Sequence, residues 1–471
     1  MHFSLTDSVY HILLFSFLAA LGSEALKRFA GGKARILFLA LASALFYLLI
    51  DPRFFLLLLG ETYAVFLLGL KVRGKDGKEK PSAASLTAGI VLVLLVLFGF
   101  KYLGLLQMVL PFRFSANLMP LGISYYSFRL ISYLADVYTG KTGPEEEWVS
   151  FFVYTAFFPQ ILSGPIVRAP GMLERLREIR RSKEREPFRE AQWSAGISLI
   201  LSGLFKKLVI ADRIGSYVDT IFWDYHLYPG LALWMAAFFY SVQLYCDFAG
   251  YSEIAAGVTN LLGFECPANF IRAYLSWDMH EFWRRWHISL SQWLRDYVYI
   301  PLGGSRRGEK RRIFNVLVLF TACGLWHGSG IKYLVWGLYH GIWNVIPKFR
   351  KQENLLLRTG QSVLTTCIAM FGWILFRAET FEKVYRYILR MFTDFSLSVA
   401  SIQASVLPFT GDNTCVAHFL TAIAMILLLL FWEIREEQGH VPNPYVRNFI
   451  CLVLVLFFGV TGSGSFLYAN Y

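Results

Sequence analysis

Long apolar stretches follow one another along most of the chain. Thirteen are long enough to cross, or nearly cross, the hydrocarbon core of a bilayer. They lie near residues 8–22, 35–50, 53–71, 85–106, 121–139, 148–166, 193–211, 229–250, 313–329, 331–347, 361–377, 415–434 and 446–467. Inside lipid, only helices and closed barrels satisfy all of their backbone hydrogen bonds. The pattern therefore predicts an all-α polytopic membrane protein.

Several of these stretches are short or interrupted. Pro159, Gly164 and Pro165 fall within residues 151–165, so a helix there is expected to stop part way. A broken helix at membrane depth is tolerated only where it is buried in protein or lines a wet cavity. We therefore expect a single domain over residues 1–471, with about 11–13 membrane segments that include re-entrant and interfacial helices.

Short basic clusters between the apolar runs orient the chain, because cytoplasmic loops are rich in Lys and Arg. Residues 168–190 carry eight basic and five acidic side chains and favour an amphipathic helix, and residues 303–312 (GGSRRGEKRR) form the densest basic loop. Residues 219–228 contain two acids and no Lys or Arg, so we place them outside. Between residues 107 and 168, a simple count of spans places the acidic residues 145–147 inside and Arg168 outside. A re-entrant or half-spanning element there would remove this conflict.

Composition agrees with a membrane protein. The chain has 471 residues, of which 56% are hydrophobic and 17% charged, and its net charge is +12. In a soluble protein a net charge of this size would suggest nucleic acid as a partner. Here the clustering of Lys and Arg between apolar runs explains the charge, so no nucleic acid is expected. The six cysteines are scattered without a CxxC pair, which predicts neither a disulfide framework nor a metal site. The first apolar run lacks a basic n-region, which favours a retained helix.

The motifs of soluble enzymes are absent or incomplete in this sequence. His280-Glu281 begins like a zinc-protease helix, but Arg284 stands where the second histidine would be. Residues 277–304 (WDMHEFWRRWHISLSQWLRDYVYIPLGG) place three tryptophans near one helical face, which is typical of an interfacial helix. His287 lies in the middle of this segment, where a lone basic ring needs a partner or a purpose.

Two further polar groups lie in apolar runs. His327, in residues 321–330 (TACGLWHGSG), follows Trp326 among glycines. It can either transfer protons near neutral pH or bond to a backbone carbonyl at a helix end. Asp247 and Gln243 are four residues apart and share a helical face. Asp247 either pairs with an arginine of residues 277–304 or lines a polar path.

Five stretches together resemble the membrane-bound O-acyltransferase family, in particular the bacterial branch that acts in alginate O-acetylation and teichoic-acid D-alanylation. They are residues 120–128 (PLGISYYSF), 158–166 (FPQILSGPI), 247–252 (DFAGYS), 282–291 (FWRRWHISLS) and 325–328 (LWHG). Residues 297–304 (YVYIPLGG) look more like the alginate-type acetyltransferases than the D-alanyl proteins.

The resemblance implies a ring of tilted helices around a central tunnel. His327 matches the active-site histidine of the family, and His287 matches the second histidine of the bacterial branch. We expect the substrate or tunnel residues to come from the same stretches and their neighbours: Trp326, Asp247, Ser252, Gln243, Trp286 and Arg284. The basic loops, including the one near Arg306 and Arg307, would hold phosphates of the donor.

The implied activity is acyl transfer across the cell (inner or plasma) membrane. A cytosolic thioester, acetyl-CoA or another acyl carrier, would donate the acyl group without any bound cofactor. His327 would act as general base, and His287 would orient the acceptor or stabilise the oxyanion. An extracytoplasmic acyltransferase partner would pass the group to a polysaccharide. D-alanyl transfer from a carrier protein, and a transporter or polymer-export component without covalent chemistry, remain as alternatives.

Overall fold

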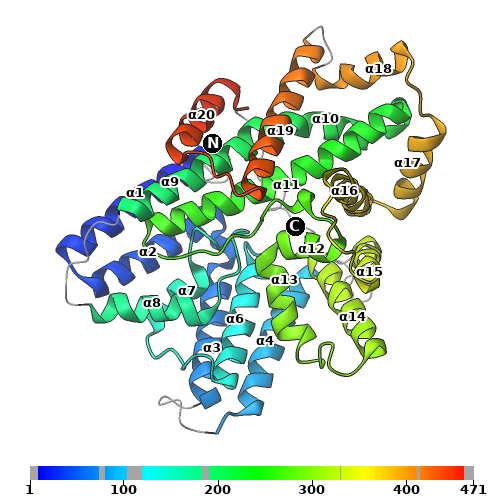
Figure 1. The fold of residues 1–471 in the computed structure, drawn as a ribbon. Helices are drawn as coiled ribbons and strands as arrows, with labels where there is room; N and C mark the ends of the chain where they lie inside the picture. Colours follow the sequence, from blue (N-terminus) through cyan, green and yellow to red (C-terminus); the bar gives the residue numbers. More distant parts are fainter. Residues whose placement is uncertain are drawn as a thin grey trace.

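The computed structural model describes residues 9–73, 80–102, 119–182, 190–328, 330–410 and 414–460, and this part of the chain is helical without strands. Parts of five expected segments, namely residues 8, 103–106, 183–189, 329 and 461–467, lie outside the described residues, as do residues 74–79 of the basic stretch 71–80 (KVRGKDGKEK). The α-helices, drawn in Figure 1, are α1 (Val9–Phe29), α2 (Gly32–Ile50), α3 (Phe55–Arg73), α4 (Ala83–Lys101), α6 (Ile123–Thr139), α7 (Trp148–Ala156), α8 (Ala169–Arg181), α9 (Glu190–Leu204), α10 (Asp212–Trp223), α11 (Gly230–Leu261), α12 (Met279–Arg285), α13 (Ile288–Leu294), α14 (Glu309–His327), α15 (Ile331–Val345), α16 (Leu355–Arg377), α17 (Phe381–Thr393), α18 (Val399–Val406), α19 (Cys415–Glu437) and α20 (Pro444–Phe458).

Eight helices of the described ranges are long and apolar enough to cross a membrane. Four more, α6, α14, α15 and α20, coincide with expected segments but are shorter or more polar. Together they make twelve, within the expected range of 11–13. The expectation of a polytopic all-α membrane protein is confirmed.

The longest helix, α11, packs along α9 at the centre of the bundle, as Figure 1 shows. The two backbones approach each other at two glycine pairs seven residues apart along each helix, Gly196 with Gly257 and Gly203 with Gly250. A Cβ on Gly203 would lie 2.5 Å from the Gly250 carbonyl oxygen. Small residues are what allow helices to pack this closely in a membrane. Helix α11 continues along this contact to Leu261, which is eleven residues beyond the expected end of the segment at residue 250.

A re-entrant element follows α6, as expected from the interrupted segment. Helix α7 ends at Ala156, before Pro159, and the chain returns without regular helix to Arg168 at the start of α8. The buried guanidinium of Arg129 supports this return by donating to the Tyr154 carbonyl at 2.8 Å and to Gln160 Oε1 at 2.6 Å. Irregular backbone at this depth is thus buried in protein, as the bilayer requires.

This element repairs the count of spans. Glu145, just before α7, accepts from Arg177 at 2.8 Å and from Arg180 at 3.1 Å, and both arginines belong to α8. The segment between Glu145 and α8 therefore enters and leaves the membrane on the same side. On that side Arg35 also donates to the Leu262 carbonyl at the end of α11. We call it the basic side, and the rule for Lys and Arg predicts that it is cytoplasmic.

Residues 277–304 do not form the single interfacial helix that the tryptophan spacing predicts. Helices α12 and α13 are separated at His287, whose φ of 43° is left-handed. The tryptophan rings at 283, 286 and 293 are buried in protein instead of facing lipid. A tertiary contact explains the break, because Ile288 N–H donates to the Asn269 carbonyl rather than to a helical partner.

Helices α14 and α15 form a hairpin whose turn follows His327, and they lie side by side in Figure 1. Gly324 and Gly337 face each other, and a Cβ on Gly324 would lie 2.1 Å from the Tyr333 carbonyl oxygen. Helix α14 has 19 residues and begins next to the basic loop. At a rise of about 1.5 Å per residue, this length carries His327 toward the opposite side of the membrane.

Candidate active site

His327 is the last residue of α14 and lies in an aromatic pocket. Its ring centroid is 4.7 Å from that of Trp326, 5.1 Å from Trp336 and 5.2 Å from Phe376. The side chain is buried, with 6% of its surface exposed. The next residue must be glycine, because a Cβ on Gly328 would lie 2.2 Å from the Tyr333 ring. The hairpin turn thus fixes where the imidazole lies.

Trp326 lies between the two histidines expected to act. Its ring is 6.2 Å from His287 and stacks on Phe128 at 5.4 Å. The ammonium of Lys101, at the end of α4, lies 5.1 Å above the indole. The indole N–H is buried and has no hydrogen-bond partner among the described residues. A buried donor of this kind has free capacity for a substrate oxygen or a water.

His287 is held by Asn269, on the segment that leads from α11 to α12. The Asn269 Oδ1 atom accepts from Ser289 N–H at 3.1 Å and from Ser289 Oγ at 2.9 Å, and it lies 3.3 Å from His287 Nδ1. An amide oxygen can only accept hydrogen bonds. Nδ1 therefore carries the proton, and Nε2 of the neutral ring presents a lone pair.

Two other expected site residues join this cluster. Ser252 Oγ accepts from Asn269 Nδ2 at 3.1 Å, which links α11 to the loop that positions His287. Trp286, 2% exposed, stacks on Phe282 at 5.4 Å and packs against Trp373 at 4.8 Å. Both residues therefore belong to the surroundings of His287.

The structure does not bring Asp247, Gln243 or Arg284 to the histidines. Asp247 Oδ1 lies 2.7 Å from Nζ of Lys207, so its ion pair is to a lysine and not to the arginines that the sequence suggested. Gln243 packs against Gly215 of α10. The Arg284 side chain is 66% exposed and pairs with Glu281 of the same helix, α12.

A cavity of about 500 Å³ lies on the basic side of His287. It is lined by Ser289 and Gln292 of α13 and by Arg168 and Arg175 at α8. Arg168 also pairs with Asp296, in the turn that leads to the basic loop. Arg306 and Arg307 lie exposed in that loop, on the same side of the bundle, but do not line the cavity.

Comparison with known proteins identifies the family of this chain. A model of the MBOAT, membrane-bound O-acyltransferase family matches residues 147–343. The chain is 33% identical to the probable alginate O-acetylase AlgI of Pseudomonas syringae pv. tomato, over 87% of this chain and 80% of that protein. The chain belongs to the membrane-bound O-acyltransferase family.

This acyltransferase is also similar, at lower identity, to two relatives with other names. It is 27% identical to the peptidoglycan O-acetyltransferase of Helicobacter pylori, over 92% of this chain and 91% of that protein. It is 28% identical to the teichoic acid D-alanyltransferase of Bacillus subtilis 168, over 65% of this chain and 81% of that protein. Both histidines fall within the residues that match the family model.

Sequence reasoning missed several residues around the site of this acyltransferase. Asn269 carries no local signal, since it reaches the site by tertiary packing. Lys101 could have been found, because it is an ionisable residue inside the apolar run of residues 85–106. His340 could have been found, because residues 337–341 (GLYHG) repeat the pattern of residues 324–328 (GLWHG). Its ring lies 4.8 Å from Trp336, fully buried, and neither nitrogen has a hydrogen-bond partner within the described ranges.

Proposed function

We propose that this acyltransferase is an O-acetyltransferase of the cytoplasmic (inner or plasma) membrane. It moves an acetyl group from cytosolic acetyl-CoA across the bilayer for O-acetylation of an extracytoplasmic polysaccharide. The observation that carries the proposal is the order of groups across the protein. The cavity beside α8 lies on the basic side, His287 and Trp326 follow, and His327 lies toward the other side.

The donor thioester enters from the cavity on the basic side. Arg168 and Arg175 are the cationic side chains that line it, beside the carboxylates of Glu174, Glu178 and Glu265, and guanidinium groups suit phosphate recognition. The acyl group reaches past Ser289 toward Trp326. Burial within the aromatic cluster excludes bulk water, which strengthens each hydrogen bond to the reacting atoms and limits hydrolysis of the thioester.

The acceptor hydroxyl reaches His327 from the opposite side. Neutral His327 takes the hydroxyl proton as the oxygen attacks the thioester carbonyl carbon. The new C–O bond forms, the C–S bond breaks, and the coenzyme leaves as a thiolate that is then protonated. The free indole N–H of Trp326 is the donor best placed to stabilise the developing oxyanion.

His287 takes the orienting role, one of the two roles left open by the sequence. With its Nδ1 proton directed to Asn269, the neutral ring offers Nε2 as an acceptor. An acceptor cannot stabilise an oxyanion, but it can align the hydroxyl group of the incoming acceptor. An extracytoplasmic acyltransferase is the expected partner that receives the acetyl group and passes it to the polymer.

The test measures acetyl-CoA turnover by the purified protein with its partner in liposomes. Turnover is monitored as the release of free thiol. His327→Ala should abolish turnover, whereas His418→Ala, which changes an exposed histidine on α19, should not. Wild-type turnover by a folded His327→Ala protein would refute the catalytic assignment. Turnover only with a D-alanyl carrier protein, or export without thioester consumption, would refute the acetyl-transfer proposal.

A further inference from the structure

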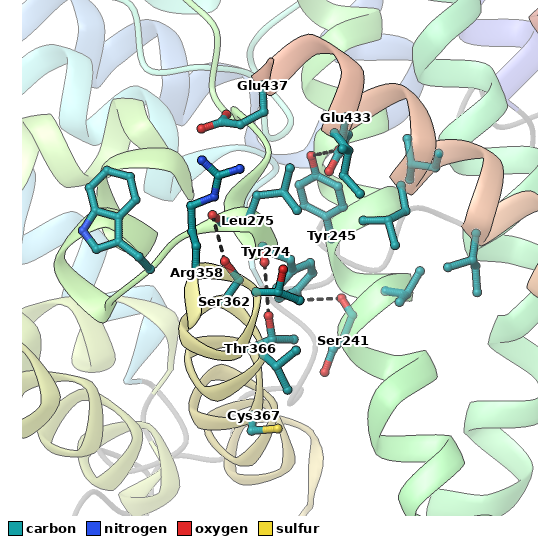
Figure 2. Close-up of a pocket in the computed structure, with 18 of the residues that line it drawn as sticks. Ser241, Tyr245, Tyr274, Leu275, Arg358, Ser362, Thr366, Cys367, Glu433 and Glu437 are labelled. Carbon is teal, nitrogen blue, oxygen red and sulfur yellow. Dashed lines mark hydrogen bonds between the residues drawn. The ribbon is translucent and has the colours of Figure 1, made fainter. Parts of the chain in front are cut away.

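A second cavity of about 450 Å³ opens between α11, α16 and α19, away from the histidines (Figure 2). We call it the α16 groove. Its walls are apolar and include Phe238, Val363 and Leu430, which are 42%, 57% and 39% exposed. In a membrane-spanning bundle such side chains face lipid rather than water. The groove is therefore open to the hydrocarbon core along its length.

One end of the groove is polar, and two cations and two carboxylates line it. Arg358, near the start of α16, lines it and makes no side-chain hydrogen bond or ion pair with any described residue. Lys351 lies 5.0 Å above the ring of Trp277 and likewise has no acidic partner in the described ranges. Cations and a tryptophan at one end of an apolar surface are typical of the headgroup level.

The acidic residues at the same end are already engaged. Glu437, labelled beside Arg358 in Figure 2, accepts from Arg285 at 3.0 Å and from Arg272 at 2.9 Å. Glu433 accepts from the hydroxyl of Tyr245. Each carboxylate therefore already has a partner inside the protein, whereas Arg358 and Lys351 have no ion-pair partner among the described residues.

The polar end faces the cytoplasmic leaflet. Arg272 and Arg285, which hold the end of α19, lie on segments that follow the basic-side end of α11. At the opposite end of α16, Arg377 pairs at 2.6 Å with Asp219, which lies in α10 and in the stretch 219–228 that the charge pattern places outside. The groove thus runs from the inner headgroup level into the hydrocarbon core.

We propose that the α16 groove binds one anionic glycerophospholipid of the cytoplasmic leaflet. Its phosphate contacts Arg358 and Lys351, and an acyl chain lies along Phe238, Val363 and Leu430. Two uncompensated cations favour a headgroup with net negative charge over a zwitterionic one. This site is separate from the proposed acyl transfer and does not depend on it.

The test is native mass spectrometry of the full-length protein titrated with phosphatidylglycerol or phosphatidylcholine of the same acyl chains, without acyl donor. Arg358→Gln and Lys351→Gln should each weaken phosphatidylglycerol binding about fivefold, and the double variant about 25-fold. Arg350→Gln removes a neighbouring exposed cation that does not line the groove, and it should change the affinity less than about twofold. Unchanged phosphatidylglycerol affinity in the double variant would overturn the proposal.

A second pair of variants tests the apolar part. Val363→Trp should fill the groove and weaken binding of both lipids, whereas Leu364→Trp, at an equally lipid-exposed position outside the groove, should not. Equal effects of the two variants, or equal affinity of the wild-type protein for both lipids, would contradict the assignment. A dimer that Val363→Trp abolishes would make the groove an interface between two copies and would also overturn it.

Discussion

Asn269 is predicted to be a positioning residue for His287. It makes four polar contacts: Nδ2 donates to Ser252 Oγ at 3.1 Å, and Oδ1 lies within 3.3 Å of His287 Nδ1 and of the Ser289 N–H and hydroxyl. Asn269→Leu keeps the approximate volume of the side chain and removes all four. The Ser289 amide is then left as a buried donor without its acceptor.

The expected cost to stability follows from these contacts. A typical hydrogen bond contributes about 0.5–1.5 kcal/mol, and an unsatisfied buried donor costs about 1–3 kcal/mol. Asn269→Leu should therefore lower the free energy of unfolding by about 2–4 kcal/mol. The effect on turnover has another cause, because the imidazole of His287 loses the acceptor that fixes its tautomer and orientation.

We expect kcat to fall about 10- to 100-fold, the size of effect seen when a group that orients a functional histidine is removed, while KM for the donor changes little. The assay is thiol release from acetyl-CoA in liposomes, at a temperature where the variant is folded. Asn315→Leu is the matched control. Asn315 is also fully buried and donates to the Gly304 carbonyl at 2.8 Å, but it does not contact either histidine.

The two variants separate positioning from stability. If Asn269→Leu turned over like the wild type, or if Asn315→Leu lost kcat to the same degree, the reasoning about His287 would be refuted. Recovery of activity in Asn269→Gln would not be expected, because the longer side chain moves the amide oxygen away from Ser289. Asn269→Ser should retain part of the activity, since its hydroxyl can still accept one hydrogen bond.

Three further predictions concern other parts of the site and its frame. Trp326→Phe keeps an aromatic ring but removes the free N–H, so kcat should fall about 10²- to 10³-fold at nearly constant KM in the same assay. Gly324→Ala brings a Cβ to 2.1 Å from the Tyr333 carbonyl, so α14 and α15 must separate; unfolding in denaturant should show a loss of about 1–3 kcal/mol, and an unchanged midpoint would contradict the close packing. Lys207→Met leaves the carboxylate of Asp247 buried without its cation, and thermal unfolding should reveal a loss of about 3–5 kcal/mol, which a Lys207→Arg variant should largely avoid.

The sequence by itself determined the membrane class, the helical fold and the interruption in residues 151–165. These follow from local features, namely apolar length, basic clusters and helix-breaking residues, which act within a few turns of the chain. It also singled out His327 and His287, because an imidazole in an apolar segment is costly wherever that segment folds. The family resemblance then supplied their expected roles.

Tertiary structure decided how those residues are arranged. The even spacing of tryptophans in residues 277–304 favours one helix, but the hydrogen bonds that the Ile288 and Ser289 N–H groups donate to Asn269 break it at His287. Likewise, Asp247 could have found an arginine, yet packing of α11 against the preceding helices gives it Lys207. The periodicity of the sequence predicts which residues share a face of a helix. It does not predict which distant group contacts that face. That contacting group determines whether a polar residue stabilises the fold or lies at the active site.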